Sequence, residues 1–444
     1  MMPETLVKTA SVISSWFSTP SSEPAIIVGP SSEHQERLKT SEDANPDLLA
    51  DDLVVAKCAE NEAPFRTAQY SSNTAFPEPA EICDDTCGGI EKTAVEYEHL
   101  VMMVHGVSGD PDNFAVLKEV FEGQLQDESV LIVRSQANRK EGSHDGVEAC
   151  GQKLAREVRR IVGEHKSLKR ISFVAFSIGG LFSRYACGVA FDPKTKTVFG
   201  LEPCHFLSIA SPHLGCHVEG EAQVPFIGWG LRVPYVDMVL KPVFDLFAAS
   251  VTKIMYGASG RHLFLDDGDA ATEPTILKLV LDIPGEGHFF SSLAQFRTRV
   301  CYANACGDAL VGWANASVRK ESELPREKCE ELELIGVVAE APLQDGCWGN
   351  SDEKKLEGLA DPRDGLGKEH SVGDFLILNR KGVVRFMLSK LQMLPWCRID
   401  VAIKNTFLAH TNIIVARKTL DSVGLPVVEH MAHRFSDLER MVKM

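Results

Sequence analysis

Residues 173–186 read FVAFSIGGLFSRYA, an apolar run that breaks at Ser177 and two glycines and then resumes with helical spacing. We expect a strand that ends at Phe176, a sharp turn at Ser177 and a helix that starts at Gly179. Such a turn exposes the serine hydroxyl at the carboxyl edge of a sheet, and glycines let the neighbouring backbone approach closely. The stretch therefore predicts a nucleophilic serine, with a serine that only caps a core helix as the alternative.

Short apolar runs alternate with helical segments along most of the chain. Most of the runs are apolar on both faces, which is typical of buried parallel strands, and the segment at 146–165 carries a helical apolar stripe. This alternation predicts an α/β fold with a doubly wound, mostly parallel sheet flanked by helices. The expected strands cover residues 99–104, 128–134, 170–176, 204–210, 298–304 and 397–404.

A loop directly after the first expected strand reads His105-Gly106-Val107. In this position the backbone N–H of Val107 can join that of Ile178, next to the serine, as the pair of donors that stabilises an oxyanion. We expect His105 and Gly106 to support this loop, with His105 not acting as the catalytic base.

An acid and a base follow the serine along the chain. Asp308 comes just after the fifth expected strand, and His410 comes after the sixth. Side chains at these strand ends can orient and deprotonate a serine, so Ser177, Asp308 and His410 form the predicted triad. Taken alone, Asp308 could equally cap a turn. We expect His410 to lie in a loop that leads into a helix starting at Thr411.

Three other histidines are alternatives for the base. His430 and His433 are three residues apart on an expected helix, which suits a surface position better than a base carried by a loop. His213 follows a strand in the middle of the sheet, and its use would break the order of serine, acid and histidine. We therefore expect His213 to have a structural role.

The composition excludes several functional classes. The chain has 444 residues, is 44% hydrophobic and has a formal net charge of -16, which opposes a general affinity for nucleic acid. No apolar run approaches the ~18 residues of a transmembrane helix. Its 12 cysteines include no CxxC pair, and Cys83 and Cys87 come closest to one. We expect reduced core thiols in an intracellular, cytoplasmic protein, with no metal and no cofactor.

The chain is expected to divide into a tail and one domain. Residues 1–96 are rich in Ser, Pro and acidic residues and are expected to be disordered, with the α/β domain at 97–444. In the tail, residues 5–17 could form an amphipathic turn that contacts a lipid surface or targets an organelle, or could be unstructured. Two insertions interrupt the domain: an apolar segment at 218–264, which is either a lid or an ordinary helical layer, and an acidic segment at 321–372.

With these motifs in place, the sequence resembles the serine esterase or lipase-like domain family of the α/β-hydrolase superfamily, found in plant and fungal proteins. The resemblance implies an α/β-hydrolase fold, with Ser177 as nucleophile, Asp308 as acid and His410 as base. It runs from about His99 to Phe435. It rests on VHGVSGDPDNF, SQANRKEGSHDGVEACGQKLAREV, SIGGLFSRYA, SIASPHLG, SGRHLFLDDGD, YANACGDALVGWANASVR, AHTNIIV and GLPVVEHMAHRF.

The chain departs from the family pattern around the serine. Family members usually have Gly-His-Ser-Leu-Gly-Gly there, whereas this chain has Ala175, Phe176 and Ile178 at the three differing positions. The residues and the resemblance together predict a hydrolase that cleaves carboxylic esters, of lipids or other acylated molecules, through an acyl-enzyme. An acyltransferase or thioesterase would use the same triad. A catalytically silent hydrolase fold that binds a lipid or a protein partner is the alternative from another class.

Overall fold

The computed structural model describes residues 96–125, 127, 129–216, 255–268, 273–331, 335–340, 380–404, 406 and 408–443. Three predictions lie largely outside these residues: the tail at 1–96, most of the apolar segment at 218–264, and most of the acidic segment at 321–372. No helix within the described residues is long and apolar enough to cross a membrane.

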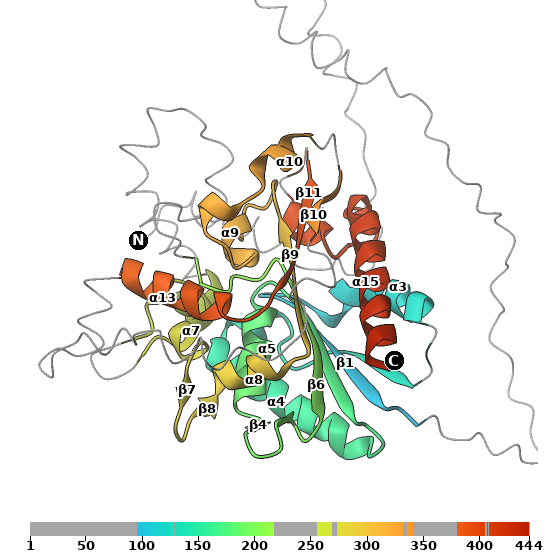
Figure 1. Ribbon diagram of the computed structural model, residues 1–444, viewed down its shortest axis with the longest axis vertical. Helices are drawn as coiled ribbons and strands as arrows, with labels where there is room; N and C mark the ends of the chain where they lie inside the picture. The colour runs from blue at the N-terminus through green and yellow to red at the C-terminus, as the bar shows by residue number, and fades with distance from the viewer. Residues whose placement is uncertain are drawn as a thin grey trace, which may run out of the picture. The chain divides into compact units, whose positions relative to one another are not determined.

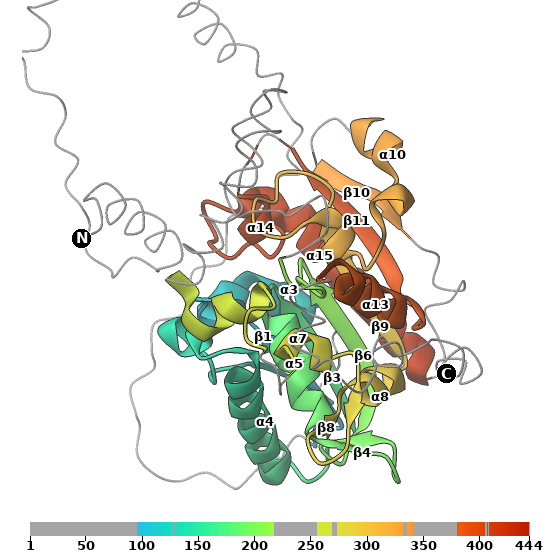
Figure 2. The ribbon, with the colours of Figure 1, turned by 90° about the vertical axis from the view of Figure 1, so that its left-hand side faces the viewer.

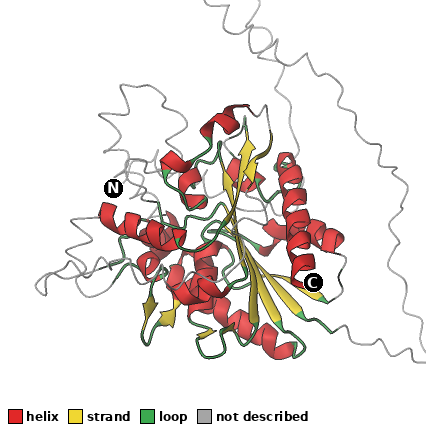
Figure 3. Ribbon diagram, in the orientation of Figure 1, coloured by secondary structure: helices red, strands yellow, loops and turns green. Residues whose placement is uncertain are grey.

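The described part of the chain is organised around a seven-stranded sheet with the strand order β10-β11-β9-β6-β3-β1-β2. All neighbours run parallel except β10, which is antiparallel to β11. The α/β prediction is confirmed, and helices cover the strands on both sides (Figure 3). The strands are β1 (His99–Val104), β2 (Val130–Arg134), β3 (Arg170–Phe176), β6 (Glu202–Ile209), β9 (Thr298–Asn304), β10 (Ile335–Glu340) and β11 (Cys397–Ile403).

Two apolar clusters fill the two faces of this sheet because successive strand residues point to opposite sides. Leu100 and Met102 of β1 belong to the cluster with α4 (Val147–Glu164), α5 (Gly179–Gly188), α8 (Phe289–Gln295) and α13 (Arg380–Gln392). Val101 and Met103 belong to the cluster with α3 (Ala115–Leu125) and α15 (Leu425–Lys443). Figure 1 shows α3 and α15 beside each other on one side of the strands, and α4, α5, α8 and α13 on the other. Both faces are thus buried, as the apolar strands predicted.

Shorter elements connect these layers. They are the helices η3 (Pro111–Phe114), η4 (Lys140–His144), α7 (Thr275–Lys278), α9 (Trp313–Ala316), η5 (Glu321–Glu323), α10 (Arg326–Glu331), α14 (Ala409–Asn412), η7 (Ser422–Gly424) and residues 255–263, and the strand pairs β4 (Phe191–Asp192) with β5 (Thr197–Val198) and β7 (Asp282–Ile283) with β8 (Gly287–His288). Figure 2 shows α14 at one end of the sheet and the β4 and β8 pairs at the other.

Two sequence expectations need correction. None of the six expected strands lies in the acidic segment at 321–372, but residues 335–340 within it form the edge strand β10. The helix expected to start at Thr411 is also wrong in extent, because α14 already begins at Ala409 and ends at Asn412, and the residues that follow form turns up to Asp421. His410 therefore lies on a short helix and not in the loop before one.

Candidate active site

The turn after β3 places Ser177 where the sequence predicted it. Ser177 follows Phe176, the last residue of β3, and α5 begins at Gly179. The backbone of Ser177 has a φ of 54°, in the left-handed region that non-glycine residues rarely adopt, and its N–H donates to the Ile209 carbonyl at 2.8 Å. A strained residue at a strand-to-helix turn projects its side chain out of the sheet edge.

Small residues around this turn are required by close backbone contacts. A Cβ at Gly179 would lie 2.5 Å from the carbonyl oxygens of Val104 and His105, and a Cβ at Gly106 would lie 2.8 Å from Ser177 Cβ. Ala175, in contrast, is an interior residue of β3 between β1 and β6, where its methyl group is buried without a positive φ. The glycine usual for the family at that position is therefore dispensable for this turn.

A chain of hydrogen bonds joins the three residues of the predicted triad. His410 Nε2 lies 3.0 Å from Ser177 Oγ, and His410 Nδ1 lies 2.9 Å from Asp308 Oδ2. An ionised carboxylate only accepts, so the Nδ1–H of His410 donates to Asp308 and leaves Nε2 to accept from the Ser177 hydroxyl. His410 is 4% exposed and Ser177 is 7% exposed, so these bonds are shielded from water.

Asp308 is held as a carboxylate by its surroundings. Burial alone would raise the pKa of Asp308, but the charge and hydrogen bond of His410, the N–H of Val311 and the amide of Asn304 together bring it below its ordinary value. Its Oδ1 accepts from the N–H groups of Leu310 and Val311 at 2.9 Å each, and its Oδ2 accepts from Asn304 Nδ2 at 2.8 Å. An ionised Asp308 can orient His410 and stabilise its protonated form.

Asn304 is a site residue that the sequence analysis missed. It is the last residue of β9 and also lies 3.3 Å, through Nδ2, from the carbonyl of Ala409 beside the histidine. A lone amide directly after the apolar run at 300–303 was the signal that could have identified it.

The loop after β1 lies against the serine turn. His105 is buried, which lowers its pKa, and its Nδ1–H donates to the Gly106 carbonyl at 3.0 Å. In the described part of the chain, the N–H groups of Val107 and Ile178 donate to no protein acceptor. Their orientation toward a reacting carbonyl stays a prediction.

Two residues that the sequence analysis did not single out hold this loop in place. Ser143 Oγ accepts from the N–H of Ser108 at 2.6 Å, and Ser108 Oγ lies 2.7 Å from His144 Nε2. Ser108 itself has a positive φ of 53°. The hydrogen bonds from η4 thus fix the backbone next to Val107.

The alternative histidines make contacts elsewhere. His213 is buried and lies 3.0 Å, through Nε2, from Ser208 Oγ, consistent with a structural role. His430 contacts the Tyr302 hydroxyl at 3.0 Å, and His433 bonds to the carbonyl of Glu429 on its own helix.

Phe176 occupies the position where family members usually have histidine. Its ring lies 4.7 Å from the His410 ring, centre to centre, at an angle of 41°. This contact packs an apolar surface against the imidazole and limits the orientations that it can adopt.

A mostly parallel sheet with a serine on a strained turn, and with an acid and a histidine beyond two later strands, defines the α/β-hydrolase class. The model of the family described as "Putative serine esterase (DUF676)" matches residues 94–318, and this chain belongs to that family. The description of this family names a serine esterase, the class of enzyme that the sequence predicts.

Two relatives in Saccharomyces cerevisiae are similar to the chain. "Putative lipase YDL109C" is 27% identical over 229 residues, covering 50% of this chain and 30% of that protein. "Putative lipase ROG1" is 24% identical over 229 residues, covering 51% and 29%. The matched region is therefore less than a third of the length of these relatives. Among solved structures, carboxyl esterase 2 of Tuber melanosporum is 13% identical, with a TM-score of 0.39, covering 78% of this chain and 79% of the other.

Proposed function

We propose that the chain hydrolyses carboxylic esters with Ser177 as nucleophile, His410 as general base and Asp308 as the group that orients the base. The hydrogen-bond chain from Ser177 Oγ through His410 to Asp308 supports this proposal more than any other observation. Both bonds lie within the range required for proton transfer from the serine.

In the first half of the reaction, His410 Nε2 takes the proton of Ser177 while Oγ bonds to the ester carbonyl carbon. The negative charge moves to the carbonyl oxygen, where the N–H groups of Val107 and Ile178 stabilise it, each by on the order of 3 kcal/mol. The protonated His410 then gives its proton to the leaving alcohol, and an acyl-enzyme remains. Water repeats these steps on the acyl group and releases the acid.

Acyl esters of lipids are the substrate class that we propose. The aromatic and aliphatic residues in the sequence of 218–264 suit an acyl chain, and the names of the yeast relatives point to lipids. A series of esters with acyl chains of increasing length tests this class. Rising kcat/KM with chain length supports it, and a preference for acetate contradicts it.

A fluorophosphonate probe tests whether the serine is reactive. We expect the full chain to be labelled and Ser177→Ala to be unlabelled. Ser183→Ala is the matched control, because Ser183 is buried on α5, the helix that follows Ser177, where its hydroxyl donates to the Gly179 carbonyl. Absence of labelling in the folded wild-type protein would contradict the proposal and favour a silent hydrolase fold that binds its ligand without cleaving it.

A further inference from the structure

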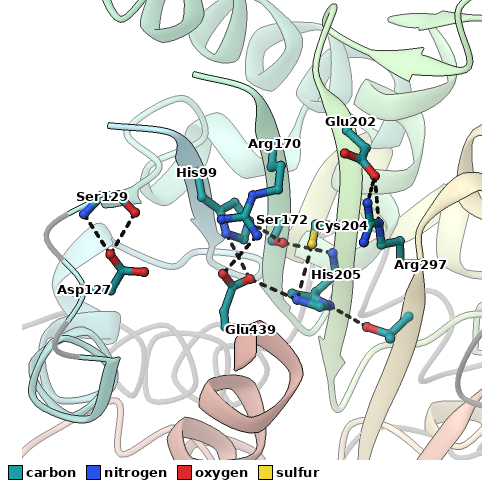
Figure 4. Close-up of polar contacts among 11 residues, drawn as sticks. His99, Asp127, Ser129, Arg170, Ser172, Glu202, Cys204, His205, Arg297 and Glu439 are labelled. Atoms are coloured by element: carbon teal, nitrogen blue, oxygen red, sulfur yellow. Dashed lines mark hydrogen bonds and ion pairs between the residues drawn. The ribbon is translucent and has the colours of Figure 1, made fainter. Parts of the chain in front are cut away.

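A second polar cluster lies at the opposite end of the sheet from the serine turn. His99 begins β1, Cys204 and His205 lie near the start of β6, and Glu439 reaches them from α15 (Figure 4). All four residues are buried, none more than 4% exposed. The 7 residues of β3 separate the two ends by roughly 20 Å, so this cluster is independent of the proposed ester chemistry.

A β-bulge brings Cys204 and His205 to the same side of the sheet. The pairing advances by three residues along β6 where it advances by two along β3, so both residues oppose Ser172. In a regular strand, neighbouring side chains point to opposite faces, whereas a bulge redirects one of them. As a result, Cys204 Sγ lies 3.4 Å from His205 Nε2.

The carboxylate of Glu439 lies among the other three groups. Its Oε1 is 3.0 Å from His99 Nδ1 and 3.0 Å from His205 Nε2. Ligand atoms of His99, Cys204 and Glu439 all lie within 4.8 Å of one another. His99 Nδ1 approaches Glu439 without hydrogen-bond geometry, and the described residues give this buried nitrogen no hydrogen-bond partner.

The far nitrogen of each imidazole is fixed by a hydroxyl group. His99 Nε2 lies 2.8 Å from Ser172 Oγ, and His205 Nδ1 lies 2.7 Å from Thr298 Oγ1. Histidines that bind metals generally have their second nitrogen hydrogen-bonded in this way, which sets the tautomer and the ring orientation. The inner nitrogens are therefore aimed at the carboxylate and the thiol.

We propose that His99, Cys204, His205 and Glu439 form a binding site for a divalent transition-metal ion, best matched by zinc. Two imidazoles, one sulfur and one carboxylate are the ligand types of tetrahedral zinc sites. Metal–ligand bonds of about 2.0–2.3 Å place ligand atoms about 3.4 Å apart in a tetrahedron. Three of the six separations among the four ligand atoms, at 3.0, 3.0 and 3.4 Å, are close to this value, and binding would draw His99, Cys204 and Glu439 together from separations of up to 4.8 Å.

Charge balance is compatible with a metal in this buried place. Zinc binds cysteine as the thiolate, so the Cys204 thiol would release its proton to solvent on binding. A divalent ion with one thiolate and one carboxylate is then neutral, which limits the cost of burial. The other oxygen of Glu439 lies 3.3 Å from Arg170 and stays available to that guanidinium. The ion would tie α15 to the first residues of β1 and β6.

The metal content and the cobalt spectrum of the full chain, without a polyhistidine tag, test this site. Grown with zinc, the protein should contain about one zinc ion per chain, and X-ray absorption should show one sulfur at about 2.3 Å among nitrogen and oxygen ligands. Grown with cobalt, it should show the near-ultraviolet charge-transfer band of a cobalt–thiolate bond.

Matched variants identify the ligands. We expect Cys204→Ala to lose the cobalt–thiolate band and Cys187→Ala, which truncates another buried thiol, to keep it. If Cys204→Ala does not fold, the proposal is tested by the wild-type protein alone, through its number of zinc ions per chain and its zinc–sulfur distance. Metal far below one ion per chain in the folded wild type would overturn the proposal. So would a cobalt–thiolate band that persists in Cys204→Ala, because the thiolate ligand would then lie elsewhere.

Discussion

His410 Nε2 lies 3.0 Å from Ser177 Oγ, although 233 positions separate the two residues in the chain. Parallel strands make this possible, because β3 and β11 both end at the same edge of the sheet. The serine is held by a strained turn, and the imidazole is held by Asp308 and by the ring of Phe176. Position along the chain matters less here than position at a strand end.

Replacement of the proposed base should abolish turnover. We expect His410→Ala to lower kcat for a short-chain ester by about 10³-fold or more, because Ser177 then has no proton acceptor. His430→Ala should retain most of the activity, since that ring contacts Tyr302 and not the serine. Steady-state kinetics of the two variants show which histidine acts as the base. Activity that is lost in His430→Ala and kept in His410→Ala would refute the assignment of His410.

Asp308→Asn should leave the fold in place but lower kcat by about 10⁴-fold. An asparagine can present its amide to Nδ1, which turns the histidine to the tautomer that cannot accept from Ser177. Circular dichroism checks the fold, and ester turnover checks the rate. Activity within tenfold of wild type would mean that Asp308 does not orient the base.

The same carboxylate should make stability depend on pH in acid. The folded-state pKa of Asp308 lies below its ordinary value of 3.8, so the folded state binds fewer protons there than the unfolded state. The stabilisation that the ionised Asp308 contributes is complete above the ordinary pKa of 3.8. It is lost as the pH falls through the lower pKa of the folded state. Urea unfolding of the wild type and of Asp308→Asn measures this loss of stability. The range from about pH 3 to about pH 7 is suitable, because ordinary carboxyl groups titrate at its acid end. We expect the difference in unfolding free energy to shrink toward acid; a constant difference would show that no such linkage exists.

The two small residues that flank the serine should respond differently to substitution. Gly179→Ala should destabilise the protein by about 1–3 kcal/mol and reduce activity, because the new methyl group would lie 2.5 Å from two carbonyl oxygens. Ala175→Gly restores the residue usual in the family and should change kcat/KM only slightly. Thermal unfolding and ester kinetics measure both, and an unperturbed Gly179→Ala would show that the close contact is not limiting.

Ser143→Ala tests the support of the proposed oxyanion loop. Loss of the hydroxyl leaves the Ser108 N–H without its acceptor, at a cost of about 1–3 kcal/mol if the group stays buried. We expect kcat to fall with little change in KM, because the loop is proposed to bind the transition state. A variant with raised KM and unchanged kcat would place the loop in substrate binding instead.

The sequence identified the serine turn well because two signals coincide there. A change from strand to helical periodicity at Phe176 and a pair of glycines mark the same boundary, and local backbone preferences agree with the tertiary fold. Helix α14 was harder to predict, since 4 residues are too few to show a periodic pattern. The chain after it turns because Asp421 binds the N–H and guanidinium of Arg417, a contact that spacing does not reveal.

Other features depend on contacts between distant segments. Strand β10 has the apolar sequence IGVVAE, but it is short, only half buried at the antiparallel edge of the sheet, and lies within a segment that is acidic overall, so composition did not reveal it. The residues of the polar cluster come from three distant segments of the chain. Regular alternation along β6 predicts that Cys204 and His205 point to opposite faces of the sheet. Only the bulge in β6, which the sequence does not reveal, brings both side chains to the same face.

An acyl-enzyme on Ser177 is the most direct test of the central claim that this serine becomes the nucleophile. The full chain is mixed with a p-nitrophenyl ester, quenched in acid during turnover, and analysed by intact mass and peptide mapping. We predict an added acyl group on the peptide that contains Ser177, formed at least as fast as kcat. Turnover of the ester with no acylated protein, or with the acyl group on another residue, would contradict the account.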